Sequence, residues 1–138
     1  MARELILKVT LPTPVLEVDP GWAITGLAAY LETKGAVTYD SGPVETEWGT
    51  MTMHGTGEYY VDWGDNTAQQ GPYGFEGLPW PDGRITHVYR DTGVYTVTVR
   101  QLWTVQWQVA QRSGVLQDRF TESTLTLPVR ELQAVRIR

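Results

Sequence analysis

The fold is decided by the stretch Tyr59-Tyr60-Val61-Asp62-Trp63-Gly64-Asp65-Asn66-Thr67. It alternates aromatic or branched side chains with others and then ends in a Gly-Asp-Asn turn. About twenty residues later come His87-Val88-Tyr89 and then Gly93-Val94-Tyr95-Thr96-Val97-Thr98-Val99, which alternates in the same way. Because a period of two is typical of half-buried β-strands, these segments predict two antiparallel strands.

Together these segments resemble the PKD domain, an immunoglobulin-like β-sandwich. That family is marked by an aromatic-Asp-aromatic-Gly-Asp-Gly strand end, followed by His-x-Tyr and a Gly-x-Tyr-x-Val-x-Val strand. The likeness covers about residues 58 to 105. The positions that carry it are Tyr59, Val61, Asp62, Trp63, Asp65, Asn66, His87, Tyr89, Gly93 and Tyr95. Because most members are extracellular and non-enzymatic, the resemblance implies a non-catalytic secreted or cell-surface module.

The chain departs from the family pattern at two places. Asn66 stands where glycine is usual, which a turn tolerates because asparagine accepts a left-handed backbone better than most residues. Residues 67–83 make a much longer connection than the family typically has.

Beyond this part, the whole chain resembles a group of uncharacterised secreted bacterial proteins. The stretches that carry this likeness are Leu11-Pro12-Thr13-Pro14 with Gly26-Leu27, Val61 to Thr67, Pro79-Trp80-Pro81-Asp82-Gly83 before His87 and Tyr89, and Leu132-Gln133-Ala134-Val135-Arg136. The likeness implies an extracellular or cell-surface location. No signal peptide is recognisable, because Met1-Ala2-Arg3-Glu4 runs directly into a strand-like segment. The alternative is a virion or cytoplasmic protein that is not exported.

Length and composition bound the class of protein. At 138 residues with no cysteine, the chain fits one domain over residues 1–138, held by packing without disulfides or thiolate metal sites. The formal net charge of −5 argues against nucleic acid as a partner, because phosphate binding needs a clustered positive surface. No run of about eighteen apolar residues exists, so the sequence predicts no membrane span.

The first half of the chain predicts several short strands. Leu5 to Leu11 alternates and predicts an opening strand. Leu27 to Glu32 fits either a helical turn or a strand, and the flanking glycines favour a strand. Val44 to His54 has a β-rich alternation that Gly55 and Gly57 are expected to close, giving a hairpin with the next strand.

The longest element is predicted from Val94 to Ala110, where the odd positions are mostly apolar and one face is expected to be buried. Such a long strand is expected to bulge midway, near Gln101. Gln111 to Gly114 would turn the chain, Phe120 to Val129 would return antiparallel, and Leu132 to Ile137 would add a last strand. With seven to nine strands and no convincing helix, the sequence predicts an all-β, immunoglobulin-like two-sheet sandwich.

Residues 67–83 are the leading candidate for an interaction site. A loop of this length without secondary structure is usually functional or disordered, and its three prolines argue against disorder. Its aromatic side chains Tyr73, Phe75 and Trp80 would offer rigid contact area to a protein or glycan partner. The alternative is that these rings fold back as a lid over one end of the sandwich.

The polar side chains near the turn form a weaker candidate site, for calcium. Asp62, Asp65 and Asp82, with Asn66, carry the hard oxygens that calcium prefers. Their spacing is not that of an EF-hand, so the favoured interpretation is that Asp65 and Asn66 cap the turn through backbone amides. Otherwise no cofactor is expected. Asp65→Ala should then lower the free energy of unfolding by about 0.5–2 kcal/mol.

The sequence argues against an enzyme. His87 occupies the His-x-Tyr position, where the resemblance implies packing and hydrogen bonding beside the turn. Ser41, Ser113 and Ser123 lack the sequence context of a nucleophile elbow. A Ser-His-Asp triad is therefore not favoured.

Two alternatives to a protein- or glycan-binding module stay open. The first is a carbohydrate-binding module that uses Trp48, Trp103 and Trp107, although parity favours the core for the last two. The second is a homo-oligomeric structural protein, such as a filament, pilus or virion component. Its copies would pair through sheet edges and the polar face of the long strand.

Overall fold

The computed structural model describes residues 11–132, except for the side chain of Asp118. Within this range the chain is all β, with eleven strands and no helix. In chain order they are β1 (Leu16–Glu17), β2 (Ala23–Ile24), β3 (Ala28–Tyr30), β4 (Glu32–Thr33), β5 (Thr38–Asp40), β6 (Val44–Thr46), β7 (Gly49–Asp62), β8 (Gln70–Tyr73), β9 (Thr86–Val88), β10 (Gly93–Val109) and β11 (Arg112–Arg130). The count exceeds the expected seven to nine because several strands have only two or three residues.

The strands predicted at the two ends of the chain, Leu5 to Leu11 and Leu132 to Ile137, lie outside the described residues except for Leu11 and Leu132. Neither of these two residues is in a strand.

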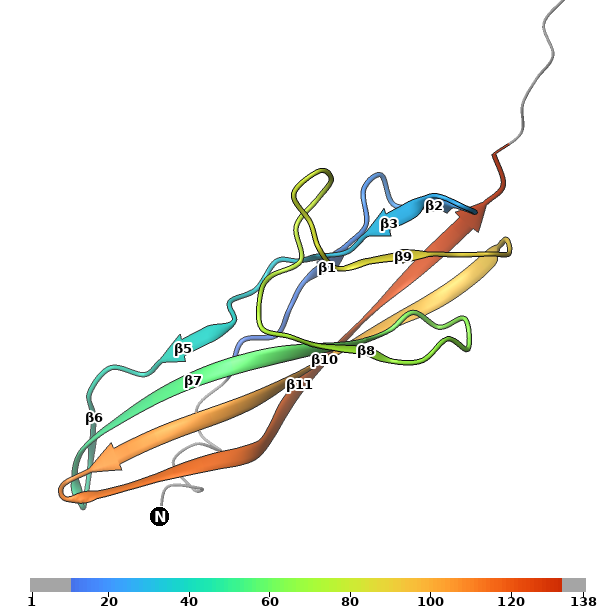
Figure 1. Cartoon of the computed structure of the whole chain (residues 1–138). Coiled ribbons are helices and arrows are strands. Elements are labelled where there is room, and N and C mark those ends of the chain that lie inside the picture. Colours follow the sequence, from blue (N-terminus) through green and yellow to red (C-terminus); the bar gives the residue numbers. More distant parts are fainter. Residues whose placement is uncertain (1–10, 133–138) are drawn as a thin grey trace, which may run out of the picture.

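Three long strands form the framework of the molecule (Figure 1). β10 lies between β7 and β11 and pairs antiparallel with both. The short strands β5, β6 and β8 pair with β7, and β2 pairs in parallel with the end of β11. Because β10 lies between β7 and β11, this strand is not a sheet edge that could pair with another copy along residues 98–109.

A second, smaller layer covers one half of this long sheet. It consists of the strand pairs β1–β4 and β3–β9, and Figure 1 places it over the half where β10 begins and β11 ends. Between the layers lies the sandwich cluster, whose fully buried members include Leu31, Tyr59, Val61, Trp63, Ile85, Tyr89, Val97, Val99 and Leu127. This half is therefore a two-layer, sandwich-like arrangement, and the inward face predicted for the strand at 59–63 is confirmed.

A second group of buried side chains, the distal cluster, lies along the other half of the sheet. Its members are Leu11, Met51, Met53, Trp103, Val105 and Val109. The odd positions of β10 thus serve both clusters in turn, with Val97 and Val99 in the first and Trp103 and Val105 in the second. The apolar face predicted for this strand is confirmed.

The strand end predicted at Gly55 and Gly57 is wrong, because both glycines lie inside β7. The turn falls earlier, at residues 47–48, between β6 and β7. A Cβ on Gly57 would lie 2.5 Å from Nε2 of Gln101, and a Cβ on Gly55 would lie 3.3 Å from the ring of Trp103. The glycines therefore leave room for two buried side chains of β10.

The bulge predicted near Gln101 lies further along the pair of strands. Trp103 pairs with Arg119 but Val105 pairs with Leu116, so two residues of β11 oppose one of β10 at this point. Gln101 itself is fully buried and keeps its place in the ladder.

The return of the chain after β10 is tighter than predicted. The turn consists of residues 110–111 instead of 111–114, and Ala110 has a φ of 53°. β11 therefore begins at Arg112, and it contains the strand predicted from Phe120 to Val129. The strand preferred for residues 27–32 is also confirmed, as β3 and β4.

Candidate functional site

The two segments that decide the fold meet in one network of side chains. His87 on β9 places Nε2 2.7 Å from Oδ2 of Asp65, and both side chains are largely buried. The His87 ring stacks on Trp63 at a centroid distance of 5.1 Å and meets Tyr89 edge-on at 4.8 Å. The Tyr89 hydroxyl donates to the carbonyl of Trp63 at 2.8 Å. His87 thus has the packing and hydrogen-bonding contacts expected for it.

The turn after β7 is held by its own carboxylates. Oδ1 of Asp62 accepts a hydrogen bond from the amide of Gly64 at 2.9 Å. Oδ1 of Asp65 accepts from the amide and the hydroxyl of Thr67 at 3.3 and 2.6 Å. Asn66 has a φ of 65°, the left-handed conformation that asparagine tolerates. The capping role predicted for Asp65 is therefore confirmed, whereas Asn66 contributes its left-handed backbone conformation and Asp62 adds a second cap.

The calcium candidates have separate surroundings. Asp62 and Asp65 bond within the turn and to His87, whereas Asp82 lies in a second turn, where its amide donates to the carbonyl of Pro79 at 3.0 Å. Across the described range 11–132, no group of three or more His, Asp or Glu side chains is arranged to hold a metal ion.

The network also determines the charge of Asp65. Burial by itself raises the pKa of this carboxyl, but the hydrogen bonds from His87 and Thr67 and the charge of His87 outweigh burial. The net pKa lies below the ordinary value of 3.8. A carboxyl whose pKa falls on folding stabilises the protein at pH above its unfolded pKa. That contribution is lost as the pH falls through the lowered folded value.

Removing the Asp65 carboxylate should therefore lower the free energy of unfolding by more than the loss of a turn cap alone would. We expect Asp65→Ala to lower the free energy of unfolding at neutral pH by about 1–3 kcal/mol, because His87 also loses its partner. Asp65→Asn should be less sensitive than the wild type to acid below pH 3.8. Urea unfolding followed by circular dichroism, at pH values on both sides of 3.8, measures both effects.

A matched control separates the two roles of Asp65. Asp40 also caps a turn, since its Oδ1 accepts from the amide of Gly42 at 2.9 Å, but this bond is exposed. Asp40 lies opposite His54 in the ladder of β5 and β7, but within residues 11–132 no hydrogen bond or ion pair joins these two side chains. Asp40→Ala should cost about 1 kcal/mol or less. Equal losses in Asp40→Ala and Asp65→Ala would contradict a stabilising contact with His87.

The connection between residues 67 and 83 is more structured than expected, because it contains β8, which pairs with β7. Oε1 of Gln70 accepts hydrogen bonds from the indole of Trp63 at 3.0 Å and from the hydroxyl of Tyr73 at 3.1 Å. Tyr73 and Phe75 both pack against the sandwich cluster, with their ring centroids 5.5 Å apart. These two rings therefore fold back onto the sandwich, as the lid alternative describes.

Trp80 differs from these rings, because it is 73% exposed. The segment that carries it is tied to the fold at Gly77, whose carbonyl accepts from the amide of Thr33 and whose amide donates to the Thr33 hydroxyl at 2.8 Å. It is closed by the amide of Gly83, which donates to the carbonyl of Pro79 at 3.0 Å. Trp80 is therefore presented from an ordered, tight loop.

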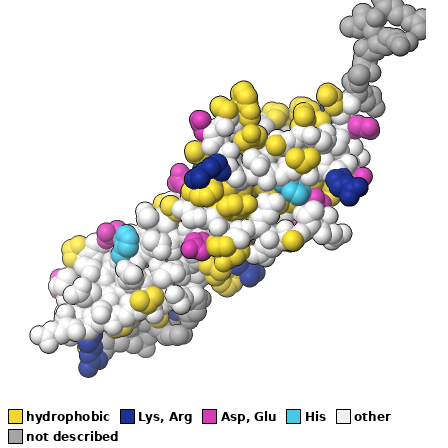
Figure 2. Space-filling view, viewed as in Figure 1, with side chains coloured by type: hydrophobic (Ala, Val, Ile, Leu, Met, Phe, Trp, Pro, Cys, Tyr) yellow, Lys and Arg dark blue, Asp and Glu magenta, His cyan; other side chains and the backbone are white. Residues whose placement is uncertain are grey.

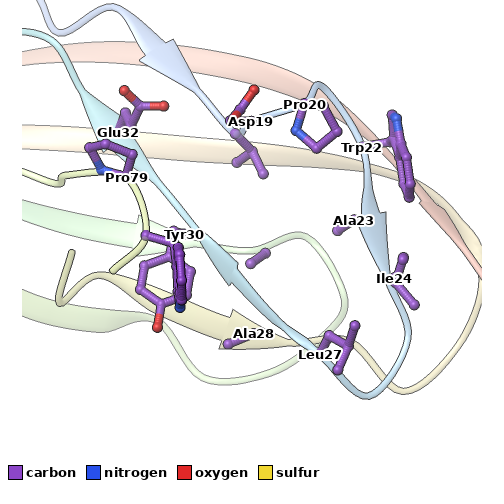
Figure 3. Close-up of a pocket in the computed structure, with 13 residues that line it drawn as sticks. Asp19, Pro20, Trp22, Ala23, Ile24, Leu27, Ala28, Tyr30, Glu32 and Pro79 are labelled. Carbon is purple, nitrogen blue, oxygen red and sulfur yellow. The ribbon is translucent and has the colours of Figure 1, made fainter. Parts of the chain in front are cut away.

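Trp80, together with the proline before it, lines a pocket of about 290 Å³ (Figure 3). The other lining residues lie between positions 18 and 32. Figure 3 shows Trp22 and Tyr30 on opposite sides of the pocket, with Asp19 and Glu32 along one border. Ligand pockets commonly measure about 300–1,000 Å³, so this one accommodates a single side chain or a single sugar ring.

Sequence reasoning found Trp80 but missed the rest of the pocket. Trp22 and Tyr30 belong to the irregular stretch between residues 12 and 43, where no motif marks them. Tyr30 reaches the site because β3 pairs with β9 and because the amide of Leu31 donates to the carbonyl of Ile85 at 3.0 Å, and Trp22 reaches it because β2, which follows it, pairs with the end of β11. On the face shown in Figure 2, exposed hydrophobic side chains gather on the half that carries this smaller layer.

The tryptophans considered for a sugar platform do not form one. Trp103 is 1% exposed, and Trp107 packs against the distal cluster. Trp48 is exposed, but it lies in the turn between β6 and β7, far from β2 and β3 in Figure 1. Of two more open hollows, the one beside Trp107 contains the imidazole of His54 as its second ring, and the one beside Trp48 contains no further aromatic ring among the described residues.

Comparison of the chain with protein-family models, with curated proteins and with solved structures finds no match. Within the described part of the chain, no helix has the length and apolar character needed to cross a bilayer. The function of the pocket has therefore to be argued from its own geometry.

Proposed function

We propose that this chain is a non-catalytic, PKD-like module that acts outside the cell or on its surface and binds a protein or glycan partner through the pocket beside Trp80. The observation that carries this proposal is the 73% exposure of Trp80 on a loop held by hydrogen bonds. An exposed, rigid tryptophan beside a pocket is typical of a binding hot spot, and contiguous apolar patches on a surface commonly mark interaction sites.

The PKD-like part of the proposal is supported by the residues that carry the resemblance. Trp63 and Asp65 are separated from His87 and Tyr89 by more than twenty positions, yet the four side chains belong to one contact network. Such a network gives a physical reason for the spacing of the pattern.

The non-catalytic part is supported by the contacts of the candidate catalytic residues. His87 is engaged with Asp65 and stacked on Trp63. The hydroxyls of Ser41 and Ser123 each donate to a backbone carbonyl at 2.6 Å, on elements other than β9. These side chains serve the fold, and none is placed as an activated nucleophile beside His87.

A binding module of this kind should be a monomer in solution. We expect light scattering to give a mass near 15.5 kDa over a wide range of concentrations. A discrete oligomer, or a polymer that grows with concentration, would contradict the proposal and favour the self-assembling structural protein.

The role of Trp80 can be tested on arrays of peptides and of glycans. We expect Trp80→Ala to lower the affinity for the peptides or glycans that the wild type binds by at least about fivefold. This loss corresponds to about 1 kcal/mol of binding free energy. Trp48→Ala is the matched control, because it removes another exposed tryptophan from the opposite end of the sheet. The proposal fails if Trp80→Ala binds like the wild type, or if both variants lose affinity equally.

A further inference from the structure

The charged side chains that line the pocket are all acidic. Asp19 and Glu32 supply carboxylates, and no lysine, arginine, amide, serine or threonine side chain is among the described lining residues. Within residues 11–132 neither carboxylate makes a hydrogen bond or a close ion pair. The pocket therefore presents two carboxylates with unused capacity to accept hydrogen bonds.

The nearby basic side chains have other partners. Lys34 is bonded to Glu17, which is the main reason that the pKa of Lys34 is raised, and Glu32 and Asp19 raise it further. The two pocket carboxylates thus already favour a cation in their neighbourhood. They also share the sign of the whole chain, which carries a formal net charge of −5.

The aromatic rings of the pocket also suit a cation. The guanidinium of Arg130 lies 5.0 Å from the ring of Trp22, within the distance of about 6 Å at which an aromatic face attracts a positive charge. Arg130 does not line the pocket, so its contact leaves the pocket side of Trp22 free for a ligand. Tyr30 and Trp80 add two more rings. Aromatic rings combined with carboxylates are typical of sites that recognise ammonium groups.

We propose that this pocket binds a lysine or arginine side chain from a basic segment of a partner protein. This inference rests on the proposed function and specifies the chemistry of the partner. Figure 3 places Ile24 and Leu27 across the pocket from Asp19 and Glu32. The apolar stem of the incoming side chain packs against Ile24 and Leu27, and its charged end lies against the two carboxylates.

A basic side chain fits the pocket better than a glycan does. Sugar hydroxyls both donate and accept hydrogen bonds, whereas a carboxylate only accepts. Covering two carboxylates with a neutral ligand carries a desolvation cost that a positive charge offsets. The charge of the pocket therefore selects a cationic occupant.

The six tryptophans of the chain provide a residue-by-residue readout. The indole N–H signals of the ¹⁵N-labelled chain are followed by NMR during titration with a capped Gly-Lys-Gly or Gly-Arg-Gly tripeptide. A capped Gly-norleucine-Gly tripeptide and a neutral oligosaccharide serve as uncharged probes. We expect the charged tripeptides to shift the signals of Trp22 and Trp80, and to leave those of Trp48, Trp63, Trp103 and Trp107 in place.

Charge-removing variants test the role of the carboxylates. Asp19→Asn and Glu32→Gln should each weaken the affinity for the lysine tripeptide about two- to fivefold, and added salt should weaken binding to the wild type. Glu47→Gln is the matched control, because Glu47 is an exposed carboxylate in the turn between β6 and β7 and should leave the affinity unchanged. Urea midpoints equal to that of the wild type show that each variant is folded.

Each outcome decides one proposal. Shifts of Trp22 and Trp80 that are equally large with the norleucine tripeptide or the oligosaccharide overturn the cationic ligand and leave the binding module standing. The absence of shifts with every probe, or unchanged affinity in both Asp19→Asn and Glu32→Gln, also overturns the cationic ligand. Failure of Trp80→Ala to weaken array binding overturns the proposed function itself.

Discussion

Trp63→Ala is expected to lower the free energy of unfolding by about 3–5 kcal/mol, which is the usual cost of truncating a buried aromatic side chain. Trp63 is fully buried in the sandwich cluster, and its indole donates to Gln70 at 3.0 Å. The substitution opens a cavity and leaves His87 without its stacking partner. Urea unfolding followed by far-ultraviolet circular dichroism measures the loss without depending on tryptophan emission.

Two further variants make this prediction sharper. Trp48→Ala removes the same side chain from an exposed turn and should change the free energy of unfolding by about 0.5 kcal/mol or less. Trp63→Phe keeps a ring but loses the indole N–H, and should fall between Trp63→Ala and the wild type. A loss below about 1 kcal/mol for Trp63→Ala would show that the sandwich cluster does not hold the sheet and the smaller layer together.

Gly64→Ala adds only one methyl group, but it should lower the free energy of unfolding by about 2–4 kcal/mol. Gly64 has a φ of +81°, and a Cβ at this position would lie 2.3 Å from the carbonyl oxygen of Thr96. The left-handed conformation alone costs a non-glycine residue about 1–2 kcal/mol. The remainder arises because the obstructing atom belongs to the backbone of β10, where Thr96 is held in place by its pairing with Thr126 of β11.

Gly74→Ala is the control for this prediction. Gly74 is not in the left-handed region, and a Cβ there would meet no atom within 4 Å. We expect it to change the free energy of unfolding by about 0.5 kcal/mol or less. Similar urea midpoints for Gly64→Ala and Gly74→Ala would contradict the close approach of the turn to Thr96.

The alternation of β7 and β10 could be predicted from the sequence because side-chain direction in a strand is a local property. Successive residues point to opposite faces, so the parity of Tyr59, Val61 and Trp63 specifies one buried face without reference to any partner. The left-handed turn at Asn66 was predictable for the same reason, since it depends on the residue's own conformational preference.

The role of the glycines in β7 could not be predicted from local sequence. A glycine in a sequence suggests a break, and Gly55 and Gly57 were therefore expected to end a strand. Their role depends on Gln101 and Trp103, which are more than forty positions away and fill the space above them. Only the pairing of β7 with β10 brings these residues together.

The features of the candidate site can also be separated into those that the sequence predicts and those that depend on tertiary contacts. By itself the sequence determined that the chain is all β, which strand faces are buried, and that the connection carrying Trp80 is unusually long. Only the tertiary structure decided that Tyr73 and Phe75 pack inward, that Trp80 stays exposed, and that Trp22 and Tyr30 complete its pocket. The physical reason is range: periodicity and turn chemistry act between neighbouring residues, whereas a pocket depends on the non-local pairing of β3 with β9.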